Sequence, residues 1–367
     1  MLSVTIVGAG VVGSVLAYRL AQAGHRVTVV DGMEPGGGTS SRSFAWLNGY
    51  DKHPEAYHRL NVLSIADHQE LAAELRGDWL HLTGCLHWAR EDEPEAERLV
   101  EVVSRMREWG TEVEELTVAQ AVASYEPGLC IDGSAVETVY RVALEGWLDA
   151  PRLAAAAIRA AEEAGARLVR STVVDLVLSD VAVEGVILGD GGRLESDVVV
   201  NAAGPKAAEV AAMAGLRLQL RRAPGLMLRI PGGGDLRGVV RSSEIFLRPA
   251  PPGHVLAHLY QIDEFAGSPA GDPKRRRALD GLHETAKRIL PSVDAVNADP
   301  IVGERPMPAD GLPVIGCDPR APGLYTIVTH SGVTLSARLA RLVARDLVEP
   351  VPELDFYRPG RALPPSP

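Results

Sequence analysis

The sequence predicts an α/β protein in two parts, one built on parallel strands with helices and the other on an antiparallel sheet. Three patterns predict this. Strand-like and helix-like segments alternate over residues 3–31, a strand, a tight turn and an amphipathic helix follow one another over 324–347, and short strand-like runs between Gly and Pro turns occupy the middle of the chain. With 367 residues the chain is long enough for two or three domains.

The composition is that of an ordinary globular protein. Hydrophobic residues make up 46% of the chain, charged residues 23%, and the formal net charge is -11. A protein that neutralises nucleic-acid phosphates is basic, so nucleic acid is not an expected partner. The three cysteines, Cys85, Cys130 and Cys317, lack the spacing of a metal site or a disulfide framework, so no metal is expected and a reducing cytoplasm is the expected location.

The stretch "SVTIVGAGVVGSVLAYRLAQAGHRVTVVD", residues 3–31, combines a β-branched strand, a G-x-G-x-x-G turn, a helix and a second strand. Gly8 suits the tight turn, Gly10 lets a pyrophosphate approach the backbone, and Gly13 lets the helix pack closely on the strand. This turn is therefore expected to bind the phosphates of a dinucleotide. A glycine-rich turn of some other α/β fold is the alternative.

The helix after this turn is expected to direct free N–H groups and a positive dipole end at the phosphates, from Val11 and Val12 onward. Asp31 ends the second strand, where its carboxylate can accept a hydrogen bond from an adenosine ribose and would repel a 2′-phosphate, which disfavours NADP. Residues 1–18 lack charged side chains, but their glycines and the absence of a Lys or Arg before them oppose a signal peptide or a membrane span.

The second strand runs into a loop rich in glycine and serine, "GMEPGGGTSSRSFAWLNGY", where an NAD-dependent dehydrogenase would continue with further βα units. Such a loop supplies backbone and hydroxyl donors for a second phosphate and a large ring system. A flexible surface loop is the alternative, but the aromatic residues favour a functional role. The residues expected to contact a cofactor here are Gly32, Thr39, Ser40, Ser41, Arg42, Ser43, Trp46, Leu47 and Asn48.

A buried strand-like run over residues 198–200 ends in small residues before a helix. So little side chain predicts a close backbone approach, either to a ligand or to another strand. The segment before this run, residues 171–197, alternates as a β-meander. Further cofactor contacts are expected at Val173, Val174, Ala202, Ala203 and Gly204.

The order of these parts resembles the flavin-dependent D-amino-acid oxidase family, in its glycine oxidase and sarcosine oxidase branch. The resemblance covers nearly the whole chain. It rests on the N-terminal glycine turn and on "SSRSFAWLN", "TGCLHWA", "EGWLDAPRLAAAA", "VVVNAAGPKAAEVA", "GERPMPADGLPVIG" and "GLYTIVTHSGVTLSARLARLVARDL". The last two segments, in this order near the C-terminus, are the most specific.

The resemblance implies a Rossmann-like FAD-binding domain interleaved with a substrate-binding domain whose antiparallel sheet covers the flavin. The FAD-binding domain is expected to comprise residues 1–78, 150–215 and 300–367. The substrate-binding domain is expected to comprise residues 79–149 and 216–299.

The helix that starts at "HSGVT" is expected to direct its N-terminus at the pyrimidine edge of the flavin, where negative charge collects on reduction. The contacts expected there are His330, Ser331, Gly332, Val333 and Thr334. His330 either assists proton transfer or is only a polar residue at a strand end.

The arginine of the R-P-x-x-x-D-G-x-P motif binds the substrate carboxylate in glycine oxidase-like relatives, and Arg305 matches that position beside the flavin. Alternatively, Arg305 pairs with Glu304 or Asp310 and only holds its turn. Strand alternation in "HVLAHLYQ" places His258 and Tyr260 on one face, which either faces the active site or lies under a helix. The expected catalytic residues are Arg305, His330, Tyr260 and His258.

The resemblance also implies non-covalent FAD, because the chain lacks both the C-terminal cysteine that links flavin in sarcosine oxidases and the first-loop histidine of dimethylglycine dehydrogenases. The implied reaction oxidises a C–N bond of a small amine or amino acid by hydride transfer from the α-carbon to the flavin, giving an imine, with O2 or another electron acceptor. The alternatives are a tailoring oxidase of a larger biosynthetic intermediate and an FAD-binding subunit of a hetero-oligomeric dehydrogenase. Substrate, stereochemistry and oligomeric state stay open.

Overall fold

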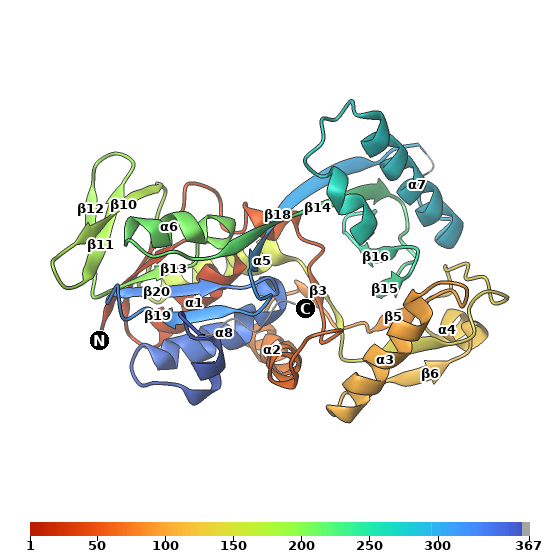
Figure 1. The fold of residues 1–367 in the computed structure, drawn as a ribbon, viewed down its shortest axis with the longest axis horizontal. Coiled ribbons are helices and arrows are strands. Elements are labelled where there is room, and N and C mark those ends of the chain that lie inside the picture. The colour runs from red at the N-terminus through yellow and green to blue at the C-terminus, as the bar shows by residue number, and fades with distance from the viewer. Residues whose placement is uncertain (295, 362–367) are drawn as a thin grey trace.

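The computed structural model describes residues 1–294 and 296–361 and shows two lobes side by side (Figure 1). One lobe contains a six-stranded sheet and the other an eight-stranded sheet. Two long strands of the second sheet, β14 (Leu220–Pro231) and β18 (Asp299–Pro308), run from one lobe into the other. The parallel core with helices and the second sheet confirm the predicted fold class.

The six-stranded sheet is parallel except for β19, which is antiparallel to β20. β1, α1 (Val11–Gln22) and β2 reproduce the predicted N-terminal unit, and β20 precedes the predicted C-terminal helix. The order across the sheet is β19 (Val314–Cys317), β20 (Leu324–Val328), β13 (Val198–Asn201), β1 (Ser3–Val7), β2 (Arg26–Val30) and β9 (Arg167–Val169).

Helices connect and cover the sheets. The α-helices in the described residues are α1 (Val11–Gln22), α2 (Glu55–Glu74), α3 (Glu95–Glu108), α4 (Val118–Ser124), α5 (Ala150–Glu163), α6 (Ala207–Met213), α7 (Pro273–Ile289) and α8 (Gly332–Asp346). The 3-10 helices are η1 (Thr39–Arg42), η2 (Gly204–Lys206), η3 (Tyr260–Phe265) and η4 (Pro352–Tyr357).

The two faces of the six-stranded sheet carry separate cores. On one face, Ile6 and Val200 lie in a core with α1, α5, α8 and α2, in which α1 packs against both α5 and α8. On the other face, Val7 and Val199 lie in a core with α6 and the predicted β-meander. Alternate residues of a strand point to opposite faces, so each central strand supplies both cores. The meander is β10 (Val173–Leu178), β11 (Val183–Leu188) and β12 (Arg193–Glu195).

The eight-stranded sheet is antiparallel apart from one parallel pair, β15 with β5. This pair joins two chain segments that are far apart in sequence, so no hairpin sets its direction. The order is β18, β14, β17 (His254–His258), β16 (Phe246–Pro249), β15 (Val239–Ser242), β5 (Cys85–Trp88), β7 (Val139–Val142) and β6 (Glu114–Leu116).

The outer face of the eight-stranded sheet is apolar. Leu86, Val240, Leu247 and Ala257 are neighbours across four strands and are all buried in one core with residues of α7 and α4. The residues next to these four along each strand point to the opposite, inner face of the sheet, toward the other lobe. This inner face is largely polar and aromatic, and it forms one wall of the site described below.

The proposed domain borders meet the sheets at two places. β18 belongs to the eight-stranded sheet and pairs with β14 along its whole length, so the proposed segment 300–367 begins inside that sheet. A small sheet of β3 (Trp46–Leu47), β8 (Gly146–Leu148) and β4 (Leu80–His81) joins the first loop to the start of α5. The division of the chain into two domains stays a proposal. No helix among the described residues is long and apolar enough to cross a membrane.

Gly13→Ala is expected to destabilise the fold. A Cβ at this position would lie 2.0 Å from the Gly8 carbonyl oxygen, which is backbone and cannot turn away. We expect a loss of at least ~1–3 kcal/mol in the free energy of unfolding, the range of an overpacked core. Denaturant unfolding measures it, with Gly281→Ala as the control, because that α7 glycine has open space around it. Equal stability of the two variants would contradict the close packing of the turn.

Candidate functional site

The glycines of the turn between β1 and α1 are of two kinds. Some are needed for close packing within the protein, whereas at Gly10 the protein itself leaves room for a side chain. Gly8 has a φ of +108°, and a Cβ there would lie 2.5 Å from the Ala202 carbonyl oxygen. The backbone at the end of β13, where the sequence predicts a close approach, therefore lies directly against the glycine turn. Gly10, in contrast, would bring its Cβ only to 3.5 Å from Ser40 Oγ. The open space beside Gly10 and the start of α1, whose N-cap residue is this glycine and offers no side-chain cap of its own, fit a bound pyrophosphate.

Asp31 lies beside this turn at the end of β2. Its carboxylate accepts hydrogen bonds from the backbone N–H of Ala9 at 2.7 Å and of Met33 at 2.8 Å. It thus holds the glycine turn against the loop that follows β2, and each oxygen keeps a lone pair for a further donor. Gly32 lies next to Thr172, since a Cβ on the glycine would be 3.2 Å from that side chain. The predicted contacts Val173 and Val174, which begin β10, therefore lie near Asp31.

The loop after β2 is exposed in part and contacts β18 of the eight-stranded sheet. Thr39 Oγ1 donates to the Glu304 carbonyl at 2.9 Å, and a Cβ on Gly303 would lie 2.3 Å from the Arg42 carbonyl oxygen. Ser40 Oγ accepts from the Val11 N–H at 3.1 Å, so this hydroxyl lies at the start of α1. The loop therefore joins the glycine turn to β18.

The other predicted loop residues have mixed environments. Ser41 donates to carbonyls of its own loop, and Ser43 accepts from the Ala45 N–H. Leu47 is fully buried in the core, so its side chain points away from a ligand. Asn48 donates to the Trp46 carbonyl at 3.1 Å.

The N-terminus of α8 lies between the glycine turn and the first loop. A Cβ on Gly332 would be 3.5 Å from Val12, and Thr334 Oγ1 donates to the Trp46 carbonyl at 3.2 Å. Ser331 begins the helix without a side-chain cap, because its hydroxyl accepts from Tyr57 instead. The helix thus keeps free N–H groups at its start, as a negative charge nearby would require.

Two titratable groups lie at this helix end. Burial, together with the charges of Lys52 and Arg305, lowers the pKa of His330 to about 3, so the imidazole is neutral at physiological pH. Burial also lowers the pKa of Lys52 to about 8, although Asp51 and Glu145 oppose the shift. A neutral histidine donates one hydrogen bond and accepts another, but it has no imidazolium proton to give as an acid.

Arg305 pairs with neither of the two carboxylates that the sequence offered. Asp310 binds Arg361, and Glu304 lies 3.7 Å from Arg222. Instead, Arg305 Nη2 lies 2.6 Å from Asp263 Oδ2 in η3 and also donates to the Pro224 carbonyl. Its Nε donates to the Ala223 carbonyl, while its Nη1 has no hydrogen-bond partner among the described residues.

Asp263 bridges Arg305 and His258. His258 Nε2 lies 3.0 Å from Asp263 Oδ1, and the carboxylate also accepts from the Leu226 N–H at 2.8 Å. Burial raises the pKa of Asp263, but His258 and Arg305 outweigh it and hold this pKa below its usual value. The aspartate therefore stays charged and fixes both predicted residues to η3.

Tyr260 does not continue the strand of His258. β17 ends at His258, and Tyr260 begins η3, so the predicted strand alternation fails at this residue. Its ring is nevertheless close to His258, at 5.0 Å between centroids, and to Phe246, at 5.2 Å. Tyr260 is 53% exposed, yet burial raises its pKa, which is the situation of a side chain at the wall of a hollow.

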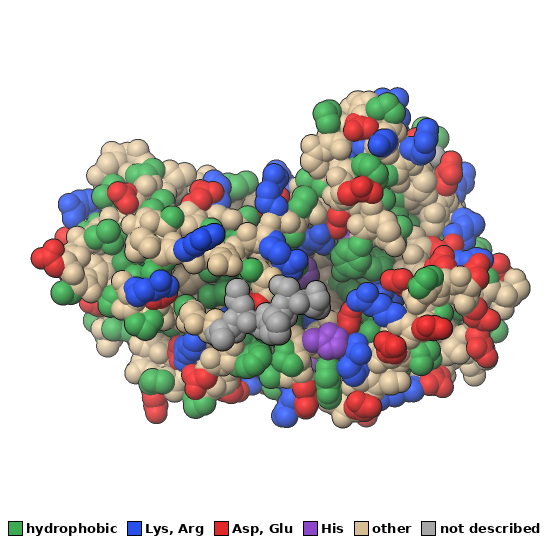
Figure 2. Space-filling model, in the orientation of Figure 1, with side chains coloured by type: hydrophobic (Ala, Val, Ile, Leu, Met, Phe, Trp, Pro, Cys, Tyr) green, Lys and Arg blue, Asp and Glu red, His purple; other side chains and the backbone are tan. Residues whose placement is uncertain are grey.

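The inner face of the eight-stranded sheet brings several of these side chains into one row. His258, Phe246, Arg241 and His87 are direct neighbours across β17, β16, β15 and β5. Aromatic residues of the first loop cover the row: Trp46 lies 6.4 Å from Phe246 and 5.7 Å from His87. Figure 2 shows the hollow between the lobes on one face, where Lys, Arg and His side chains gather.

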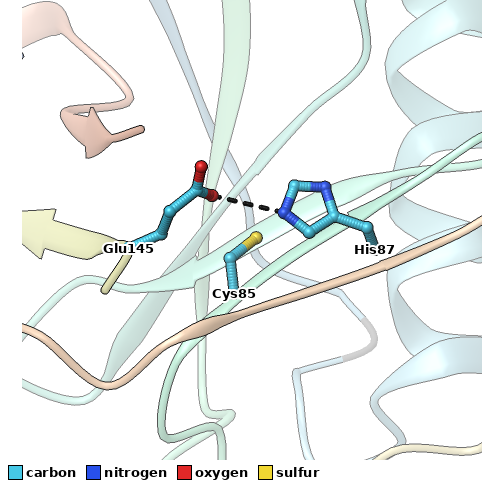
Figure 3. A group of neighbouring side chains, drawn as sticks. All are labelled: Cys85, His87 and Glu145. Carbon is cyan, nitrogen blue, oxygen red and sulfur yellow. Dashed lines mark hydrogen bonds and ion pairs between the residues drawn. The ribbon is translucent and has the colours of Figure 1, made fainter. Parts of the chain in front are cut away.

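Glu145 ties the first loop to this row. Its carboxylate accepts from the Trp46 indole at 3.1 Å, from the Gly49 N–H at 3.1 Å and from His87 Nε2 at 3.2 Å. Cys85 lies beside His87 and Glu145 (Figure 3), and the three possible ligand atoms are within 4.8 Å of one another. Burial and the Glu145 charge raise the pKa of the Cys85 thiol well above its usual value. Both oxygens of Glu145 already accept hydrogen bonds, so the group is a hydrogen-bonded cluster rather than an open metal site.

Five residues at this site were not among the sequence predictions. Each of them contacts a segment that is distant in the sequence, so its role does not follow from its own surrounding residues. Arg241 alone left a signal, a charged residue directly after the β-branched pair of the strand-like run "GVVRS". The five are Tyr50, Lys52, Glu145, Arg241 and Asp263.

Comparison with known proteins matches this architecture. Residues 3–345 match the model of the FAD dependent oxidoreductase family. A glycine oxidase of Geobacillus kaustophilus is 31% identical over 363 residues, covering 94% of this chain and 92% of that protein. Its crystal structure is similar with a TM-score of 0.83, at 27% identity and with 99% of each chain covered. One of the subunits of an opine oxidase from Agrobacterium tumefaciens is 28% identical, covering 94% and 92% of the two chains.

Gly10→Val is expected to abolish flavin binding while leaving the fold intact. The nearest atom to a Cβ at this position is the Ser40 hydroxyl oxygen at 3.5 Å, so the protein itself can accommodate a valine side chain. That side chain would, however, occupy the space through which a pyrophosphate approaches the backbone. Flavin absorbance per protein after purification, together with circular dichroism, measures this. A folded Gly10→Val protein with full flavin content would place the dinucleotide elsewhere.

Proposed function

Because the chain belongs to the FAD dependent oxidoreductase family, we propose that it oxidises a C–N bond of a small amino acid, with FAD held non-covalently between the lobes. FAD supplies the hydride acceptor when bound. The observation that carries this proposal is the position of Arg305 on β18, a strand that contacts both the first loop at η1 and β20, the strand that leads into α8. The Arg305 charge also helps to lower the pKa of His330 at that helix end. A carboxylate on Arg305 would thus lie next to the helix end assigned to the flavin.

Arg305 is suited to this role in a specific way. Nε and Nη2 are occupied by backbone carbonyls and Asp263, whereas Nη1 is available. A substrate carboxylate therefore binds at Nη1, and a two-point clamp forms only if the Asp263 carboxylate turns away from Nη2. Asp263 positions the guanidinium in either case.

The other residues orient the substrate and exclude water. Tyr260 lies under the Arg305 guanidinium, 5.8 Å from ring centroid to Cζ, and with Phe246 it offers an apolar wall to the substrate carbon chain. His330 stays neutral and adds no charge where the flavin ring is expected. An amine that binds in its neutral form can lose hydride from its α-carbon while its nitrogen lone pair forms the C=N bond. The product is a protonated imine, which gives the neutral imine by losing a proton to water. No strong general base is required.

A second candidate function is that of a flavoprotein component of a larger dehydrogenase, with another protein as electron acceptor. The observation that favours it is the similarity, along nearly the whole chain, to one component of an opine oxidase. Anaerobic reduction of the purified single chain by an amino acid separates the two. Reduction without a partner supports the amino-acid oxidase proposal, and reduction only after addition of a second protein supports the multi-component dehydrogenase.

Acid precipitation is expected to release the flavin from the protein. The described residues place Cys317 beside Tyr325, at the start of β20, whereas the N-terminus of α8 follows the other end of that strand. No cysteine or histidine at either family attachment position is present to form a covalent link. Absorbance of the supernatant after precipitation measures the outcome. Yellow colour that stays in the pellet would contradict non-covalent binding.

Arg305→Met is expected to raise KM for glycine by about 100-fold, corresponding to ~3 kcal/mol for a lost charged hydrogen-bond pair. The reaction with an amine that lacks a carboxylate should change little, and Arg305→Lys should recover only part of the loss. Arg222→Met is the matched control, since this exposed arginine lies on the paired strand. Equal losses for glycine and the amine would mean that Arg305 holds the loop and not the ligand.

A further inference from the structure

Arg241 is a buried arginine whose guanidinium has no direct partner in the described chain, and the carboxylate next to it, Glu145, is bound to His87 on the neighbouring strand. Its side chain is 6% exposed, Nη1 is completely buried, and the guanidinium has no hydrogen bond and no ion pair with residues 1–294 or 296–361. A buried charge costs several kcal/mol unless it is paired. A site that keeps such a group is built for a negatively charged ligand.

Two further arginines of the site, Arg305 and Arg248, differ from Arg241. Arg305 is paired with Asp263. Arg248, also buried, donates to the carbonyls of Phe44 and Pro249. Neither is left without an acceptor, so among the three only Arg241 has no direct partner in the described residues.

The surroundings of Arg241 hold it without neutralising it. Its Cζ lies 4.3 Å from the Tyr50 ring and 5.5 Å from the Phe246 ring, so the guanidinium is fixed between aromatic faces. The Tyr50 hydroxyl is also buried without a partner among the described residues, and this ring stacks on His87 at 4.9 Å. Tyr50 and Arg241 therefore offer two kinds of unused donor to one acceptor group.

Arg241 and Arg305 lie at the same aromatic pair. Arg305 lies over the Tyr260 ring and Arg241 over the Phe246 ring, and these two rings are in contact at 5.2 Å. The charges of both arginines act on the Tyr260 hydroxyl and oppose the rise in its pKa that burial causes. A ligand along this aromatic wall can thus meet a cation at each end.

We propose that Arg241, assisted by the Tyr50 hydroxyl, binds a second acidic group of the substrate, so that the preferred substrates are amino or imino dicarboxylates. This inference rests on the proposed function, in which Arg305 binds the first carboxylate and the oxidised C–N bond lies between the two acidic groups. Arg241 is then the residue that determines substrate length and charge.

The test uses pairs of compounds that differ by one carboxylate. Iminodiacetate and N-ethylglycine are compared as reductants of the flavin in the holoenzyme without oxygen. Glutarate and pentanoate, in which a methylene replaces the nitrogen, are compared as non-reacting ligands by calorimetric titration. In wild type, glutarate should bind at least 10-fold more tightly than pentanoate. Arg241→Met should weaken the binding of glutarate by about 10- to 100-fold, the effect of losing a charged hydrogen bond. The binding of pentanoate should change much less.

Arg237→Met is the control for loss of a positive charge, because this exposed residue lies two positions before β15 and outside the site. It should leave both affinities within a factor of about two, as expected for an exposed charge. If neither amino compound reduces the flavin while glutarate still depends on Arg241, the proposed reaction is wrong and the anion site stands. Glutarate that binds no better than pentanoate to the wild type, or Arg241→Met losses equal for both acids, would overturn the proposal. The wild-type comparison decides it even if Arg241→Met does not fold, and Arg241→Lys, which keeps the charge, should retain part of the preference.

Discussion

The site depends on one buried carboxylate, that of Glu145. Its oxygens receive the Trp46 indole, the Gly49 N–H and His87, so a single group fastens the loop after the first βαβ unit to the inner face of the eight-stranded sheet. Glu145 and His87 are fully buried, and removing either would leave a polar partner without a hydrogen bond in the interior. The spacing between the two lobes, and hence the room for a ring system between them, follows from this contact.

The distribution of charge on the two lobes follows a common logic. One arginine of the site is balanced by an aspartate that also holds a histidine, and another is left unbalanced between aromatic rings. A balanced arginine is held in one orientation by its partner, whereas an unbalanced one gains most from an incoming anion. The chain therefore places one directly paired arginine and one without a direct partner on the same wall.

The sequence predicted the parts of this fold that depend on local patterns. The strand and glycine turn at residues 3–13, the meander at 171–197 and the C-terminal helix are present because turn chemistry and periodicity act over short distances. Asp263 and Arg241 could not be found in the same way, since their roles come from contacts with segments far apart in the chain: Asp263 in η3 binds Arg305 of β18, and Arg241 of β15 lies beside His87 of β5. Tyr260 shows the limit within one segment: strand alternation does not reach it, because β17 ends at His258 and η3 begins at Tyr260.

The way in which the chain builds its two sheets has a consequence for its synthesis. β1 pairs with β13, which in turn pairs with β20, and β5 pairs with β15, so each sheet closes only after most of the polypeptide has left the ribosome. Contacts this distant in sequence are slow to form, and the early strands keep unpaired edges until then. The lobes therefore mature together rather than in succession, and the space between them is complete only when the last third of the protein has been made.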